Sequence, residues 1–79
     1  MSREEIFVKI NEVFRYEFDN DSLQITAETT APDVEGWDSL KHISLLEAIE
    51  DEFDIRFTML EVNGMKNVGE MVDIIVSRI

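Results

Sequence analysis

The sequence lacks cysteine entirely and holds only one proline and three glycines among its 79 residues. Without cysteine, the chain can supply no disulfide framework, no thiolate nucleophile and no Cys-ligated metal site. Basic residues are also scarce, because 7 Lys and Arg stand against 18 Asp and Glu, for a net charge of −11. A field of that sign disfavours nucleic acid and anionic membranes as partners and favours basic protein surfaces.

The chain also lacks a long apolar run, so no segment is expected to span a bilayer. Residues 1–10, MSREEIFVKI, carry charges where a signal peptide needs apolar residues. A hydrophobic fraction of 44% is nevertheless too high for a disordered acidic tail. Because no repeat or flexible linker divides the sequence, we expect a single domain over residues 1–79, cytoplasmic and, given its self-repulsion, monomeric.

Apolar residues that recur at three- and four-residue steps predict the first two helices. Ser2 and Glu5 have the spacing of a capping box, which predicts a helix over residues 2–17. A second helix is expected to open at Asp38 or Ser39. Its inward face is predicted to carry Leu40, Ile43, Leu46, Ile49 and Phe53.

Two further helices follow from the same signals. Thr58 and Glu61 repeat the capping-box spacing, which predicts a short third helix that ends near Val62, where Asn63 and Gly64 stop it. The last helix is expected over residues 67–79. No segment alternates with period two for long enough to indicate a sheet, so the fold class is all-α, a small four-helix bundle with a long first loop and a short third helix.

The long first loop covers residues 19–37. A loop of this length is unusual in a compact domain and indicates local anchoring or function. Its expected anchors are Leu23, Ile25 and Val34. The triplet at residues 19–21 is similar to the start of a calcium loop, but the glycine and the bidentate glutamate of an EF-hand are missing at their offsets. A metal site is therefore not expected.

The sequence at residues 36–42, GWDSLKH, concentrates the residues that could carry chemistry. Asp38, Ser39 and His42 together suggest a Ser-His-Asp hydrolase, but no Gly-rich elbow or oxyanion donor accompanies them, so catalysis is not expected. A lone His near a helix start is usually a solvated polar residue. Ser39 has two open interpretations. Its hydroxyl could be exposed at the helix N-terminus, where a phosphodiester attached to it would be favoured, or it could simply cap the helix.

Residues 36–57 resemble the acyl carrier proteins and related carrier domains. The resemblance rests on Asp38-Ser39-Leu40 at the start of the second helix and on the acidic end of that helix, EDEF at residues 50–53. It extends over essentially the whole chain. It implies that Ser39 is the attachment point of 4′-phosphopantetheine, transferred from coenzyme A by a phosphopantetheinyl transferase. The arm's thiol would hold acyl groups as thioesters, and the chain would have no catalysis of its own.

The resemblance also implies roles for the neighbours of Ser39. Asp38 would cap the helix and present the serine, and Leu40 would be a surface residue gripped by partners or else a first-turn core residue. Partner enzymes that load and transfer acyl groups, with basic docking surfaces, would contact Lys41, Glu47, Glu50 and Asp51. An acyl-chain cleft would draw its lining from Ile43, Leu46, Ile49, Phe53, Met59, Leu60, Met65, Met71 and Ile75, although plain core packing is the favoured explanation for most of these residues.

Four residues depart from the pattern of many fatty-acid carriers: Lys41, His42, Met59 and Leu60. They make the expected docking surface less uniformly acidic, which favours a discrete carrier of polyketide, nonribosomal peptide or modified-sugar assembly over fatty-acid synthesis. His42 could also modulate the phosphate environment. Trp37 is expected to pack over the loop or to flank the arm. The competing hypothesis is an unmodified acidic adaptor that binds a basic protein through its second helix.

Overall fold

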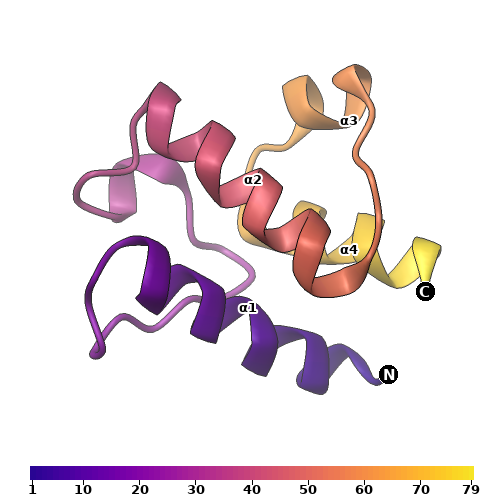
Figure 1. Ribbon diagram of the computed structural model, residues 1–79, viewed down its shortest axis with the longest axis horizontal. Coiled ribbons are helices and arrows are strands. Elements are labelled where there is room, and N and C mark those ends of the chain that lie inside the picture. Colours follow the sequence, from indigo (N-terminus) through magenta and orange to yellow (C-terminus); the bar gives the residue numbers. More distant parts are fainter.

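The computed structural model describes residues 1–79 and contains helices joined by loops, with no strand (Figure 1). The helices are α1 (Arg3–Glu17), α2 (Ser39–Phe53), α3 (Met59–Gly64) and α4 (Val68–Arg78), and a 3₁₀ turn, η1 (Ala31–Asp33), interrupts the first loop. The predicted all-α bundle with a long first loop and a short third helix is therefore confirmed. No helix has the length and apolar character needed to cross a membrane.

The helices begin where the sequence places capping residues. Ser2 caps α1 in a full capping box with Glu5, and Thr58 does the same for α3 with Glu61. Asp38 caps α2, and its carboxylate accepts a hydrogen bond from the backbone N–H of Lys41 at 2.8 Å. Each cap satisfies backbone N–H groups that have no partner within the helix, so these boundaries are set by local chemistry.

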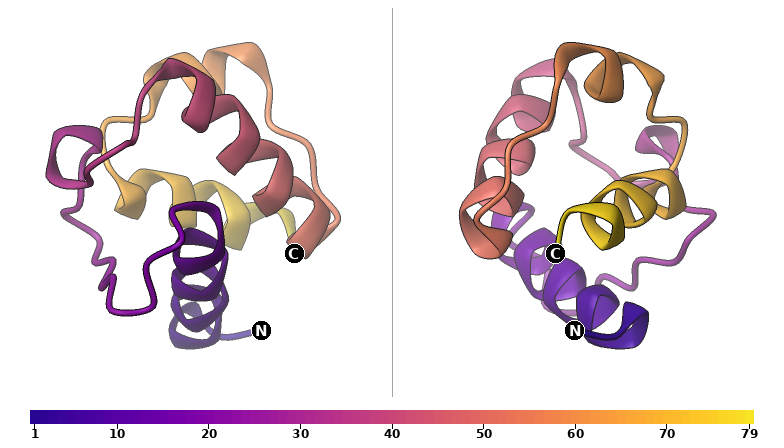
Figure 2. Two further views of the ribbon diagram at one scale, coloured as in Figure 1. Left: turned by 60° about the vertical axis from the view of Figure 1, so that its left-hand side comes forward. Right: turned by 90° about the vertical axis from the view of Figure 1, so that its right-hand side faces the viewer.

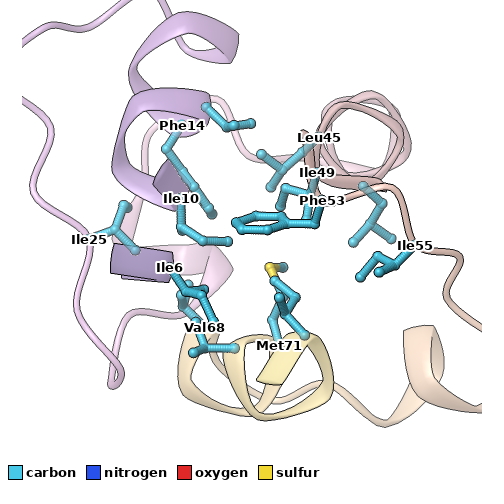
Figure 3. Close-up of a cluster of buried hydrophobic side chains, with 14 of the residues drawn as sticks. Ile6, Ile10, Phe14, Ile25, Leu45, Ile49, Phe53, Ile55, Val68 and Met71 are labelled. Carbon is cyan, nitrogen blue, oxygen red and sulfur yellow. The ribbon is translucent and has the colours of Figure 1, made fainter. Parts of the chain in front are cut away.

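The core consists of fifteen buried apolar side chains contributed by α1, α2, α4 and the loops. In Figure 3, Ile10 from α1, Phe53 from α2 and Met71 from α4 point toward one another across the centre of this core. The short helix α3 lies on the side of the molecule away from α1 and contributes no fully buried residue (Figure 2). The bundle therefore has three structural helices, with α3 left at one edge.

The long loop is fixed to the helices at several points. Ile25 and Val34 are buried and Leu23 is partly buried, which confirms the predicted anchors. Asn11 of α1 pairs with Ile25 in both directions, because its Oδ1 accepts from the Ile25 N–H at 2.7 Å and its Nδ2 donates to the Ile25 carbonyl at 3.2 Å. At the start of α4, the N–H of Gly69 donates to the carbonyl of Ala27 at 2.8 Å. The loop thus supplies partners for backbone groups at the first turn of α4.

The structure corrects the predicted inward face of α2. Leu40 and Ile43 are 80% and 58% exposed, whereas Leu45, absent from the prediction, is fully buried. Leu46, Ile49 and Phe53 are buried as predicted. Two helical stripes share Leu46 and Ile49, and spacing alone does not distinguish the stripe through residues 40 and 43 from the one through residue 45.

The predicted end of α3 is also wrong. Asn63 and Gly64 do not stop the helix near Val62 but form its last turn, and the chain becomes extended at Met65, with φ −70° and ψ 116°. Gly64 does not adopt the left-handed conformation that makes glycine a helix terminator, whereas Gly36 does, with φ +89°. The half-buried side chain of Met65 packs against the core.

Candidate functional site

The predicted site lies at the start of α2, where a tight turn leads into the helix. The left-handed backbone of Gly36 allows the N–H of Trp37 to bond the carbonyl of Val34 at 3.2 Å and that of Asp38 to bond the carbonyl of Gly36 at 3.0 Å. Asp38 then adopts an extended conformation, as a capping residue does, and Ser39 becomes the first helical residue.

This arrangement excludes the interpretation of Ser39 as the helix cap. Asp38 caps the helix, so the capping role is already filled. Ser39 is exposed, and its hydroxyl makes no hydrogen bond within the chain. The serine is therefore a free hydroxyl in the first turn of a helix, where unpaired N–H groups favour negative charge.

Trp37 anchors the turn to α1. Its ring packs edge-on against Phe14 with centroids 5.2 Å apart and lies 6.1 Å from Phe18. Its indole Nε1–H donates to Nδ1 of His42 at 3.0 Å, and the two rings stack at 5.9 Å. Trp37 thus packs against the end of α1 rather than over the loop, and it borders the space beside Ser39.

His42 is half-buried, which corrects the interpretation of this residue as a solvated surface histidine. Burial lowers the pKa of His42 from its ordinary value, because desolvation disfavours the charged ring. Since Nδ1 accepts from Trp37, the neutral ring carries its proton on Nε2. A hydrolytic triad needs the opposite arrangement, an Nδ1–H that donates to an acid, and the Asp38 carboxylate instead binds a backbone N–H. The geometry contains no Ser-His-Asp triad.

An open hollow of about 550 Å³ lies beside Ser39. It is lined by Ala31, Trp37, Asp38, Ser39, His42, Ile43 and Met65. A smaller neighbouring cavity of about 80 Å³ shares Ala31, Trp37, His42 and Met65 and reaches Met71. Of the predicted cleft residues, Ile43, Met65 and Met71 line these spaces. The others do not, because Leu46, Ile49, Phe53 and Ile75 lie in the core and Met59 and Leu60 project from the surface of α3. Ala31, in the 3₁₀ turn of the long loop, was missed.

The predicted docking residues divide into two pairs. Glu47 and Asp51 are exposed on α2 and make no hydrogen bond or ion pair within the chain. Glu50 is half-buried, and its carboxylate accepts from the N–H of Phe57 at 2.8 Å. The ammonium of Lys41 donates to the carbonyl of Glu17 at 2.9 Å. Glu50 and Lys41 therefore stabilise the fold, and Glu47 and Asp51 are the pair available to a partner.

Leu40 is exposed next to Ser39, which excludes the alternative that it is a first-turn core residue. With Ile43 it forms an apolar strip along the exposed side of α2, one turn before Glu47. No group of three or more His, Asp or Glu side chains is arranged to hold a metal ion.

Comparison with known proteins assigns this arrangement to a family. Residues 9–75 match the family described as the phosphopantetheine attachment site. The chain belongs to this family. Members of the acyl carrier protein family carry a 4′-phosphopantetheine group, act as carriers without catalytic activity, and interact with phosphopantetheinyl transferases and acyl-handling enzymes.

The sequence relatives are acyl carrier proteins. That of Saccharopolyspora erythraea is 32% identical over 74 residues, which covers 94% of this chain and 78% of the relative. That of Streptococcus pneumoniae is 34% identical over 67 residues, which covers 85% and 86%. Among solved structures, holo acyl carrier protein from Geobacter metallireducens superposes with a TM-score of 0.84 at 37% identity, covering 90% of this chain and 82% of the other. A second solved structure, of a proposed acyl carrier protein from Mycobacterium tuberculosis, superposes with a TM-score of 0.83 at 28% identity, covering 94% of this chain and 99% of the other.

Proposed function

We propose that Ser39 is the residue that carries the 4′-phosphopantetheine arm and that the arm's thiol holds acyl groups as thioesters for delivery to partner enzymes. The observation that carries this proposal is the free, exposed hydroxyl of Ser39 in a helical turn already capped by Asp38. Attachment joins the serine oxygen to phosphorus and releases the nucleotide part of coenzyme A. The reaction needs a separate transferase, because the turn contains no base positioned to activate the hydroxyl.

The shape and chemistry of the hollow beside Ser39 support the same proposal. Trp37, Ile43 and Met65 give it an apolar side along which a flexible chain could lie, and His42 gives it a polar one. When bound, the arm supplies the thiol that the chain itself lacks. Residues 1–79 form, in this proposal, one cytoplasmic carrier domain.

For its partners, the proposal names enzymes with a basic surface next to an apolar pocket. Glu47 and Asp51 offer free carboxylates, and Leu40 and Ile43 offer exposed apolar area on the same helix as the arm. Charged contacts at the edge of an interface accelerate association and make it salt-sensitive, while an apolar anchor at its centre provides affinity.

The proposal further assigns the chain to a specialised assembly pathway, of polyketide, nonribosomal peptide or modified-sugar type, rather than to fatty-acid synthesis. Its support is the chemistry of the surface near the arm. Lys41 and His42 follow the serine motif, and Met59 and Leu60 are exposed on α3. A partner that docks there meets an apolar surface on α3 instead of an acidic one.

A thiol assay tests the attachment. Because the chain has no cysteine, unmodified protein contains no thiol, and each attached arm adds one. After incubation with coenzyme A, magnesium and a broad-specificity transferase, followed by removal of free thiols, we expect one thiol per chain. The Ser39→Ala variant should contain none. Ser44→Ala, which changes another exposed serine of α2, should still contain one.

The alternative function, an unmodified acidic adaptor, rests on the free carboxylates of Glu47 and Asp51. It predicts salt-sensitive binding to a basic protein that persists in Ser39→Ala. A wild-type chain that stays without thiol, under conditions that modify a known carrier, would contradict the carrier proposal and leave the adaptor as the better one.

A further inference from the structure

His42 occupies a position beside the proposed attachment point that the carrier function does not by itself explain. It lies three residues after Ser39 in α2, so the two side chains lie on one face of the helix, with their Cβ atoms about 5–6 Å apart by helical geometry. Both line the same open hollow. The ring has one hydrogen bond within the chain, from Trp37 to Nδ1, while its Nε2–H has no protein partner and is open to solvent.

Among the side chains that line the hollow, the N–H donor without a protein partner is the Nε2–H of His42. Asp38 and Ser39 are the remaining polar side chains that line it, and the Asp38 carboxylate is an acceptor already bound to a backbone N–H. The indole N–H of Trp37 is occupied by His42 itself. A negatively charged group placed in this hollow therefore meets one side-chain N–H donor that no other protein group occupies.

The charged side chains on the surrounding elements are mostly engaged elsewhere. On α2, the Lys41 ammonium is bonded to the carbonyl of Glu17 at the end of α1. In η1, the Asp33 carboxylate is bonded to Thr30. In the connection before α4, Lys66 lines the smaller cavity with His42. None of these charges makes a contact with the imidazole that would fix its protonation state.

We propose that His42 binds the phosphodiester group of the arm by donating its Nε2–H to a non-bridging oxygen, while Trp37 holds the ring in the required tautomer. The inference rests on the proposed attachment at Ser39. It assigns Trp37 and His42 a shared role, because Trp37 docks on Phe14 and Phe18 and thereby fixes a ring that lines the same hollow as Ser39. A hydrogen bond to a charged oxygen is stronger than one between neutral groups, so the contact would restrain the base of the arm.

The contact has a consequence for protonation. Without the arm, burial keeps the pKa of His42 below its usual value. A negative charge at hydrogen-bond distance favours the imidazolium, so modification should raise that pKa. The indole N–H opposes protonation, since the charged ring has no acceptor at Nδ1. Trp37→Phe, which keeps an aromatic ring and removes the donor, should therefore raise the His42 pKa in both the unmodified and the modified protein.

The phosphorus resonance of the modified protein provides the test. A phosphodiester has no ionisation of its own between pH 5 and 8, so a pH-dependent ³¹P shift in that range reports a neighbouring group. His42 is the single histidine of the chain, and its ring proton signals can be titrated in the same sample without ambiguity. We expect the ³¹P shift to inflect at the pH at which the ring titrates, and that pH to be higher in modified than in unmodified protein.

The matched variants are His42→Gln, in which the modified protein should show a flat ³¹P profile, and Trp37→Phe, in which ring and phosphorus should both inflect at higher pH. If either variant fails to fold, the comparison of modified and unmodified wild-type protein decides alone. A flat ³¹P profile in wild-type protein whose ring titrates, or equal ring pKa values with and without the arm, overturns the role of His42. The attachment would still stand, because the resonance itself reports it. Absence of any protein-bound ³¹P signal after transferase treatment would refute the attachment as well.

Discussion

Removal of the Asp38 cap should destabilise the protein through one identifiable contact. The Asp38 carboxylate accepts from the Lys41 N–H at 2.8 Å and is exposed, so the loss involves no packing. Replacement of a capping Asp by Ala typically costs about 1 kcal/mol, within a range of roughly 0.5–2 kcal/mol. The carboxylate also interacts favourably with the helix dipole, which adds about 0.3–1 kcal/mol. For a domain of this size, each 1 kcal/mol lowers the melting temperature by roughly 4–8 °C.

Two further variants separate the cap from the charge. Asp38→Asn keeps an acceptor oxygen, so it should lose only the dipole contribution and unfold within a few degrees of wild type. Asp21→Ala removes the same charge from an exposed loop position without a hydrogen bond in the structure, and should be close to neutral. Thermal unfolding followed by circular dichroism, at one pH and salt concentration, measures all three. If Asp38→Asn loses as much stability as Asp38→Ala, or if Asp38→Ala melts with wild type, the capping argument is refuted.

Three other perturbations have expected outcomes. Gly69→Ala should lower the melting temperature, because its Cβ would lie 2.9 Å from a backbone carbonyl of the long loop. Gly64→Ala meets nothing within 4 Å and should raise the melting temperature slightly. A Gly69→Ala variant that melts above Gly64→Ala would contradict the packing. The unfolding free energy of unmodified protein should fall as the pH drops below about 6.5, because the unfolded state binds a proton there that the folded state, with its lowered His42 pKa, does not. The His42→Gln variant should lack this fall in unfolding free energy. A variant with the same pH profile as the wild type would rule out His42 as the cause. Glu47→Lys should slow modification by a transferase several-fold at low salt and much less at high salt. The control Asp21→Lys makes the same charge change, and equal slowing by both would indicate net charge alone.

The helices were predictable because their starts depend on neighbouring residues. Ser2, Asp38, Thr58 and Asn67 each accept from a backbone N–H three residues later, which is a local interaction and leaves a local pattern. The interior faces were less predictable. Position 45 rather than 40 and 43 faces the core because of how α2 packs against its neighbours, and spacing within one helix does not contain that information.

The site was predictable only in part, for the same physical reason. The serine motif is contiguous, so it could be recognised from the chain alone. The burial of His42 depends on Trp37, which in turn docks on Phe14 and Phe18 of a different helix. The hollow also requires Ala31, which the folding of the long loop brings beside the motif. Contacts between segments far apart in sequence have no signature in a single chain, and these were the contacts that were missed.

The most direct test of the central claim is the mass of the protein after treatment with coenzyme A, magnesium and transferase, combined with fragmentation that locates the added group. We expect one 4′-phosphopantetheine per chain, carried by Ser39 and absent from Ser39→Ala. An added group on any other residue, or an unchanged mass beside a fully modified control carrier, would contradict it.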